Sequence, residues 1–348
     1  MFYIHQTSCI SAQHTFSDGD INELHPSSGN LLKSIEPPYN GIPPGILRRM
    51  GKSVRMSVGA ALSLLDNNPT IQGIIIGTAN GGKEDCVKFL KQMVEYKEGL
   101  LTPINFVQST PNAPAAQIGL LTRNNGYNIT HVHHGLAFEF SMTDADMMIT
   151  EDPEKSFLLG AVDDISTYNY NFEQKSGWYK TGIVSNTSLY QSNSPGSIPG
   201  EAAVMFLVNG IKEGAVAMVH AVDTLHNEDE IVVKEKLLNF ITQQLPEGEK
   251  IDLLLSGENG DSRLLKYYTA CENVLKENVS IARFKHMSGE FPTAAAMGLW
   301  TCCKILQNQS VPDHMIKKDS AQLVYKNVLI YNTYKGRQHS FMLVSVPS

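Results

Sequence analysis

The sequence predicts one large α/β fold with buried sheet strands, and three observations lead to it. Short apolar, β-branched runs alternate with helical patterns along nearly the whole chain. The chain has 348 residues and no low-complexity linker that would divide it into independent modules. Hydrophobic residues make up 42% of it and charged residues 18%, which provides enough apolar surface to fill a sizeable core.

The individual elements follow from these patterns in chain order. In the first part, strands are expected at 2–4, 71–77, 127–132, 156–162 and 201–208, and helices at 46–65, 84–96 and 135–150. Further on, strands are expected at 214–221, 251–255 and 279–283, helices at 228–244, 262–276 and 291–307, and a closing hairpin at 328–346. The glycine-rich turn 77–82 lacks the GxxxxGK[ST] and GxGxxG spacings, so it does not predict a nucleotide site.

The order of elements repeats, which predicts two halves of similar structure. We place them at 1–212 and 213–348. Within the first half, the segment 167–199 is rich in Tyr, Ser, Asn and Gly, and we expect it to be an excursion of loops.

Composition narrows the function classes and the compartment. The formal net charge of -7 argues against nucleic acid, because phosphate binding needs clustered Lys and Arg. No apolar run approaches the roughly 20 residues of a membrane span, and His5, Gln6 and Ser8 lie where a signal peptide would be apolar, so a cytoplasmic protein is expected. The five cysteines have no CxxC spacing, which favours reduced, buried thiols. We expect no cofactor.

Five segments, in this order, resemble the β-ketoacyl synthase family of the thiolase-like superfamily. They are 48–56 (RRMGKSVRM), 77–82 (GTANGG), 111–119 (PNAPAAQIG), 196–203 (GSIPGEAA) and 284–290 (FKHMSGE). The resemblance implies a thiolase-like five-layer α-β-α-β-α fold built from two similar halves. It also implies a dimer whose interface pairs strands across a two-fold axis.

The residues that carry the family's chemistry are replaced in this chain. Condensation in that family needs a cysteine at a helix N-terminus, which forms the acyl-enzyme, and two histidines that stabilise an enolate. The resemblance places Val132 at the cysteine position, or His133 if the turn is displaced by one residue. Gly257 or Glu258 stands at the first histidine. At the second, Lys285 matches the motif and Glu290 replaces the histidine.

The stretch 332–340 replaces a glycine-rich loop that a phenylalanine gates in the family. Tyr334, Gly336 and Arg337 are therefore candidate residues of a pocket or gating loop. Lys335, Arg337 and Gln338 fill glycine positions there, so a backbone that needs positive φ would be strained.

Loss of the whole set predicts that the chain alone does not condense acyl groups. The resemblance then implies a chain-length-factor-type or scaffolding subunit in fatty acid, polyketide or aryl-polyene-type biosynthesis. Its partners would be an active ketosynthase paralogue, or a second copy of itself, and an acyl carrier protein. The alternative is an acyl-handling enzyme with replaced chemistry, in which His133 works with Glu258 or Glu290 as an acid-base pair.

Two further clusters have both a functional and a structural interpretation. His131 and His133 alternate on a strand, but zinc would need a third ligand such as Glu290, and we predict no metal site. Basic residues precede and begin the first long helix, where they could meet an acidic carrier protein or form a solvated face or internal salt bridges. They are Arg48, Arg49, Lys52 and Arg55.

Overall fold

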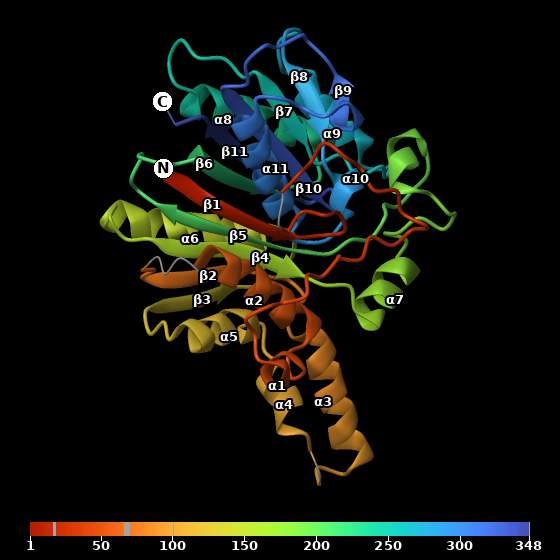
Figure 1. The fold of residues 1–348 in the computed structure, drawn as a ribbon. Helices are drawn as coiled ribbons and strands as arrows, with labels where there is room; N and C mark the ends of the chain where they lie inside the picture. Colours follow the sequence, from red (N-terminus) through yellow and green to blue (C-terminus); the bar gives the residue numbers. More distant parts are fainter. Residues whose placement is uncertain (17–18, 66–69, 100, 348) are drawn as a thin grey trace.

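The computed structural model describes residues 1–16, 19–65, 70–99 and 101–347, within which eleven strands form one mixed sheet (Figure 1). The strands are β1 (Phe2–Ile10), β2 (Gly73–Gly77), β3 (Tyr127–His131), β4 (Phe157–Asp163), β5 (Ala202–Asn209), β6 (Ala217–His226), β7 (Leu253–Ser256), β8 (Ser280–Arg283), β9 (Ile316–Lys318), β10 (Asn327–Tyr334) and β11 (Gln338–Ser345). The helices are α1 (Pro44–Leu47), α2 (Lys52–Leu65), α3 (Lys83–Glu95), α4 (Pro103–Val107), α5 (Ala113–Thr122), α6 (Ala137–Glu151), α7 (Thr167–Lys175), α8 (Glu230–Gln244), α9 (Leu265–Glu272), α10 (Lys285–Ser288) and α11 (Ala294–Asn308). Short 3-10 helices are η1 (His134–Leu136), η2 (Asn186–Gln191) and η3 (Asp313–Met315).

The two halves repeat one strand order. The first half runs β3-β2-β4-β5-β1, and the second runs β8-β7-β10-β11-β6. In each, the first two pairings of this order are parallel and the last two are antiparallel. β1 pairs with β6 and joins the halves. The division predicted at 212/213 lies in the connection between β5 and β6, and it stays a prediction.

Burial on alternate strand positions produces the five layers. On β2, Ile75 faces the central core, while Ile74 and Ile76 face the outer core under α2 and α5. On β10, Ile330 faces the central core and Leu329 faces the outer core under α8 and α9. The buried helices α6 and α11 fill the central layer. The predicted five-layer α-β-α-β-α fold of two similar halves is therefore confirmed.

Several elements differ from the sequence prediction. The helix expected at 46–65 divides into α1 and α2, and the strand expected at 2–4 extends to Ile10. The excursion 167–199 contains α7 and η2, so the expectation of loops alone was wrong. There Ser166 caps α7 by accepting a hydrogen bond from the Asn169 N–H at 3.2 Å, a local signal that the polar composition obscured.

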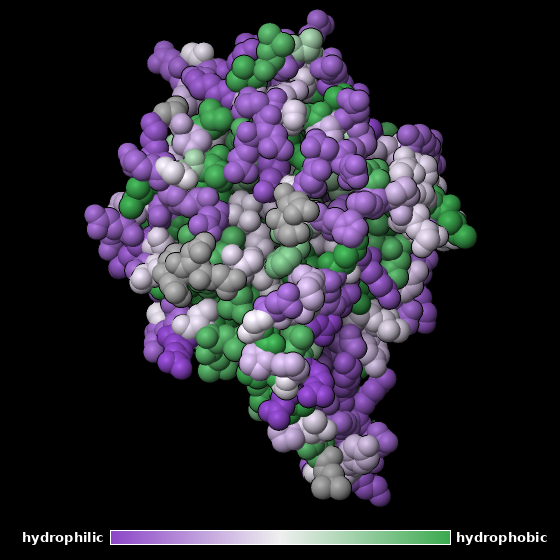
Figure 2. All heavy atoms as spheres, viewed as in Figure 1, coloured by the Kyte–Doolittle hydropathy of each residue, from purple (hydrophilic) through white to green (hydrophobic). Residues whose placement is uncertain are grey.

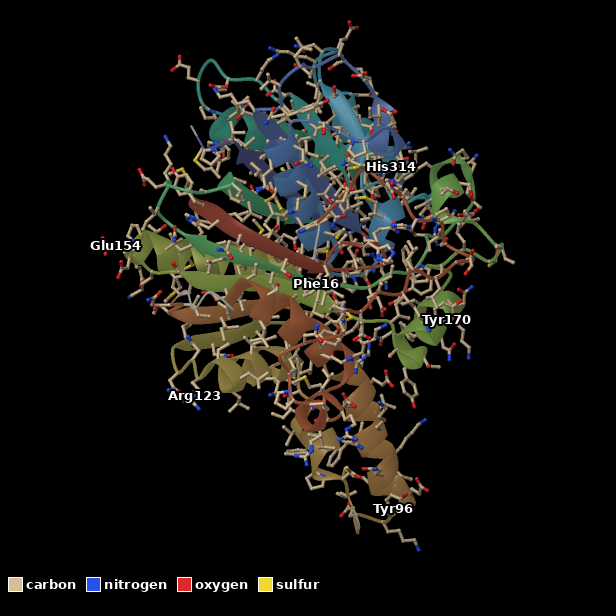
Figure 3. The ribbon with its side chains drawn as sticks, viewed as in Figure 1. Phe16, Tyr96, Arg123, Glu154, Tyr170 and His314 are labelled. Carbon is tan, nitrogen blue, oxygen red and sulfur yellow. The ribbon has the colours of Figure 1, made fainter. Side chains whose placement is uncertain are left out.

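The α3–α4 hairpin projects from the body (Figure 1). Neither helix has a buried residue, and the side chains of Val94, Phe106 and Val107 are exposed. The hairpin presents hydrophilic and hydrophobic residues together to solvent (Figure 2), and Tyr96 lies at its far tip (Figure 3). In the described part of the chain, the helices are all too short or too polar to cross a membrane.

Candidate functional site

The turn from β3 into α6 brings a glycine, rather than a candidate nucleophile, into the interior. His134 has a φ of 43°, and this left-handed residue redirects the chain into η1. Val132, 52% exposed, and His133 lie on the surface, whereas Gly135 is buried. The buried residue of this turn is thus neither of the two that the sequence suggested.

Two residues of the β10–β11 region close over Gly135. The Gly135 N–H donates to Oε1 of Gln338 at 3.0 Å. The Tyr334 side chain packs so closely that a Cβ added to Gly135 would lie 2.2 Å from the Tyr334 Cβ. The backbone donor beside the helix N-terminus is therefore already bound, and the position has no room for a side chain.

The three histidines near this turn do not form one site. His131 is 2.9 Å from Asp144 through Nε2, and the His133 ring packs edge-on against Phe140 at 4.7 Å between centroids. The His133 Nδ1 lies 3.4 Å from Nε2 of Gln338. In residues 1–16, 19–65, 70–99 and 101–347, no group of three or more His, Cys, Asp or Glu could hold a metal ion.

A buried ionic cluster surrounds Glu290. Nζ of Lys285 donates to the two Glu290 oxygens at 3.0 and 2.8 Å, and Nδ2 of Asn259 donates to Oε2 at 2.5 Å. Lys285 is fully buried, which lowers its pKa. The backbone reaches this position through Gly289, whose φ of 79° and close approach to Gly200 exclude a side chain. Both carboxylate oxygens are thus engaged by donors other than His133.

Glu258 belongs to a different cluster. Its carboxylate accepts from Nη1 of Arg283 at 3.2 Å and from Nζ of Lys317 at 2.5 Å. Lys317 also contacts Glu272 at 2.8 Å. Among the described residues, neither carboxylate has a hydrogen bond to His133, whose ring contacts Phe140 and Gln338 instead, so the acid-base pair of His133 with Glu258 or Glu290 stays a prediction. Gly257 has no room either, since a Cβ there would lie 2.5 Å from Oδ1 of Asn332.

A small cavity of about 50 Å³, lined by both polar and apolar groups, remains beside Glu290. Asn259, Asn169, Tyr334 and Lys335 are among the residues that line it. This volume holds a few water molecules, since each needs roughly 10–15 Å³ measured in this way.

The predicted gating residues lie on opposite sides of their turn. Tyr334 lines the cavity, while Arg337 is exposed and its Nε lies 2.6 Å from Glu228. Gly336, between them, has a φ of 66°. Only one end of the predicted gating loop therefore faces the pocket.

Asp163 fixes the glycine-rich turn beside the cavity. Its Oδ1 accepts from the backbone N–H groups of Ala79 and Asn80 at 3.0 and 2.7 Å. Its Oδ2 accepts from the Thr293 hydroxyl at 2.8 Å. Burial raises the pKa of Asp163 to about 6. These bonds join the two halves of the fold beside the cavity, which Asn80 lines.

The basic cluster is divided between internal ion pairs and the surface. Lys52 pairs with Glu201, and Arg55 pairs with Glu36 through Nε at 2.6 Å. Arg48 and Arg49 stay exposed. Two of the four predicted docking residues thus have internal carboxylate partners.

Comparisons with known proteins identify the fold. The structure is similar to a β-ketoacyl synthase from Burkholderia phymatum (14% identity, covering 99% of each chain, TM-score 0.77). It also resembles a ketosynthase in complex with its chain length factor from Xenorhabdus doucetiae (12% identity, covering 99% of this chain and 98% of that chain, TM-score 0.77). A third similar structure is a type II polyketide synthase acyl carrier protein in complex with its ketosynthase (10% identity, 99% of each chain, TM-score 0.77).

The chain has the thiolase-like fold of the β-ketoacyl synthases. No protein-family model and no curated protein matches the sequence. At these identities, the likeness establishes the ketosynthase-like fold, and the function must be argued from the site.

Sequence reasoning missed three residues of this site. They are Gly135, Asn259 and Asp163's partner Thr293. Gly135 could have been found by its place directly before the apolar helix pattern of α6. No local pattern marks the other two, because their partners lie far away in the sequence. Gln338 was named as filling a glycine position, but its hydrogen bond to Gly135 was not predicted.

Proposed function

We propose that this chain is a noncatalytic ketosynthase-like subunit that acts beside an active ketosynthase, in the manner of a chain length factor. In this proposal, Gly135 occupies the place of the nucleophile, three residues after Val132 and two residues after His133. A glycine has no atom that could form an acyl-enzyme, and the carboxylate of Glu290 would repel a developing enolate. The single observation that carries the proposal is the closure of Gly135 by Tyr334 and Gln338.

The surface supports a partner of the same fold. β3 is the edge strand of the first half and pairs only with β2 among the described strands, so one side of its backbone is open for pairing. The α3–α4 hairpin adds exposed apolar side chains that the isolated chain does not cover. We assign both features to the interface with the ketosynthase paralogue.

An acyl carrier protein is the second proposed partner. Arg48 and Arg49 are the members of the basic cluster that stay free to meet an acidic carrier surface. The products would belong to fatty acid, polyketide or aryl-polyene-type biosynthesis.

The test is mass spectrometry of the purified chain after incubation with malonyl-loaded and acyl-loaded carrier protein, alone and with the candidate ketosynthase. We expect no acyl adduct and no turnover from the chain alone, and a changed product length when the ketosynthase is present. A covalent acyl adduct or condensation by the chain alone would disprove the proposal. Identical products from the ketosynthase with and without the chain would also disprove the proposal.

A further inference from the structure

The turn between β10 and β11 holds a lysine in a strained conformation. The Arg337 N–H donates to the Tyr334 carbonyl oxygen at 3.2 Å, and Lys335 and Gly336 have φ values of 56° and 66°. This is the geometry of a type I′ turn, whose first central position favours Asn, Asp or Gly. Lysine is less favourable than these residues at that position, so the contacts of its side chain must account for its presence there.

The Lys335 side chain reaches across to the excursion that contains α7. Its Nζ lies 2.8 Å from Oε1 and 2.7 Å from Oε2 of Glu173, and both side chains are largely buried. The ammonium also lies 5.3 Å from the ring centroid of Trp178 and 5.1 Å from that of Tyr334. Arg263 contacts the same indole at 4.6 Å, so two cations hold Trp178 in place. This arrangement joins segments from the two halves of the fold.

Beneath these contacts lies the 50 Å³ cavity, with an unsatisfied amide in its wall. Asn169 of α7 is only 7% exposed, and neither its Oδ1 nor its Nδ2 has a hydrogen-bond partner among the described residues. A buried polar group without a partner is unfavourable unless water or a ligand satisfies it. Tyr170, on the next position of α7 (Figure 3), and Tyr179 stack at 5.6 Å beside it. The Asn169 amide can therefore form hydrogen bonds with a water molecule or ligand that enters the cavity.

We propose that Lys335, Glu173 and Trp178 form a latch that holds the β10–β11 turn against α7 and shields the Asn169 amide in the cavity wall from solvent. Release of the ion pair frees the turn to move away from α7, and Asn169 then becomes accessible. The inference rests on the proposed function in treating the cavity as the remnant of an acyl-binding site. Its physical content, the gating of access to Asn169, concerns this chain alone and is tested without a partner.

The experiment measures how fast a thiol in the cavity reacts with a maleimide. Asn169→Cys supplies the thiol, and peptide mass spectrometry separates its adduct from those of the native cysteines. The rate is compared in N169C, N169C/K335M and N169C/E173Q. A matched control, N169C/K326M, breaks the Lys326–Glu249 ion pair, which lies outside the cavity lining.

We expect both latch variants to react about 5- to 30-fold faster than N169C, because each loses a largely buried ion pair and K335M also loses the cation–π contact. The K326M control should react at the rate of N169C. Equal rates in all four proteins would overturn the latch.

A second measurement covers the case in which the cysteine variants do not fold. Amide hydrogen exchange of α7 is compared between the unmodified protein and K335M, and faster exchange of 167–175 in K335M is expected. Unchanged exchange would overturn the latch. Either result is independent of product length in the presence of a ketosynthase, so failure of the latch and failure of the proposed function are distinguishable.

Discussion

Replacing Gly135 by alanine tests whether Tyr334 packs against this position, because tight packing predicts a lower free energy of unfolding and helix propensity alone predicts a higher one. Gly135 lies in a short helix and its φ is not positive, so helix propensity alone would make alanine more stable by up to about 1 kcal/mol. The added Cβ, however, would lie 2.2 Å from Cβ and 2.5 Å from Cγ of Tyr334. Ordinary carbon contacts are about 3.5–4.0 Å, so Tyr334 must move by more than roughly 1 Å. Overpacking of this kind costs about 1–3 kcal/mol, and loss of the Gln338 hydrogen bond adds about 1 kcal/mol.

We therefore expect Gly135→Ala to lower the free energy of unfolding by about 2–3 kcal/mol, measured by urea denaturation with an unchanged m-value. Gly45→Ala is the control, because a Cβ at Gly45 has nothing within 4 Å, and it should change stability by less than about 0.5 kcal/mol. In a Tyr334→Gly background, where both clashing atoms are gone, Gly135→Ala should be nearly neutral. A Gly135→Ala protein as stable as the unmodified one, with Tyr334 present, would refute the argument for a closed site.

Two further predictions concern the buried charges. Glu290→Gln leaves the Lys285 ammonium without its anion, so the free energy of unfolding at pH 7 should fall by about 3 kcal/mol, and adding Lys285→Met should restore most of it. This loss of stability should shrink as the pH rises toward 10. Burial lowers the pKa of Lys285, so at high pH the folded protein has released the Lys285 proton while the unfolded chain still holds it. A loss that does not change with pH would contradict this. Burial raises the pKa of Glu139 from 4.5 to about 7, so the folded protein retains a proton that the unfolded chain releases. Stability should thus decline between pH 4.5 and 7, and Glu139→Gln should flatten this part of a pH series of urea titrations, whereas an identical decline would exclude Glu139 as its source.

The strands were predictable because their burial follows simple periods. In β2 the three residues between the end glycines are apolar, and in β10 the run from Val328 to Tyr331 is apolar, which matches strands covered by helices on both faces. β1 was cut short in the prediction because His5 and Gln6 interrupt its apolar run, yet the strand continues past an irregular register there to Ile10. The pairing of β1 with both β5 and β6 supplies hydrogen bonds that the local sequence does not reveal.

Part of the site was predictable for a similar reason. Lys285 and Glu290 are separated by one short helix and a glycine, so a motif read along the chain places them together. Glu258 is different, because its direction depends on Arg283 and Lys317, which come from β8 and β9. A sequence motif specifies the backbone position of Glu258 but not which of two neighbouring clusters its carboxylate joins.

The burial of Gly135 at the turn between β3 and α6 could not be predicted from the sequence. A strand-to-helix turn can start one or two residues earlier or later without changing the apolar pattern on either side, and the left-handed conformation of His134 decides which residue enters the interior. Histidine tolerates the left-handed region, but its presence in a sequence does not predict that conformation. Once the turn is fixed, Tyr334 can pack on the backbone and Gln338 can bind its N–H only because the residue there is glycine. In the proposed function, the lack of a nucleophile and the packing of Tyr334 over Gly135 are therefore one structural feature. A cysteine placed at Gly135 would meet the same obstruction as alanine, and its backbone N–H would already be bound by Gln338.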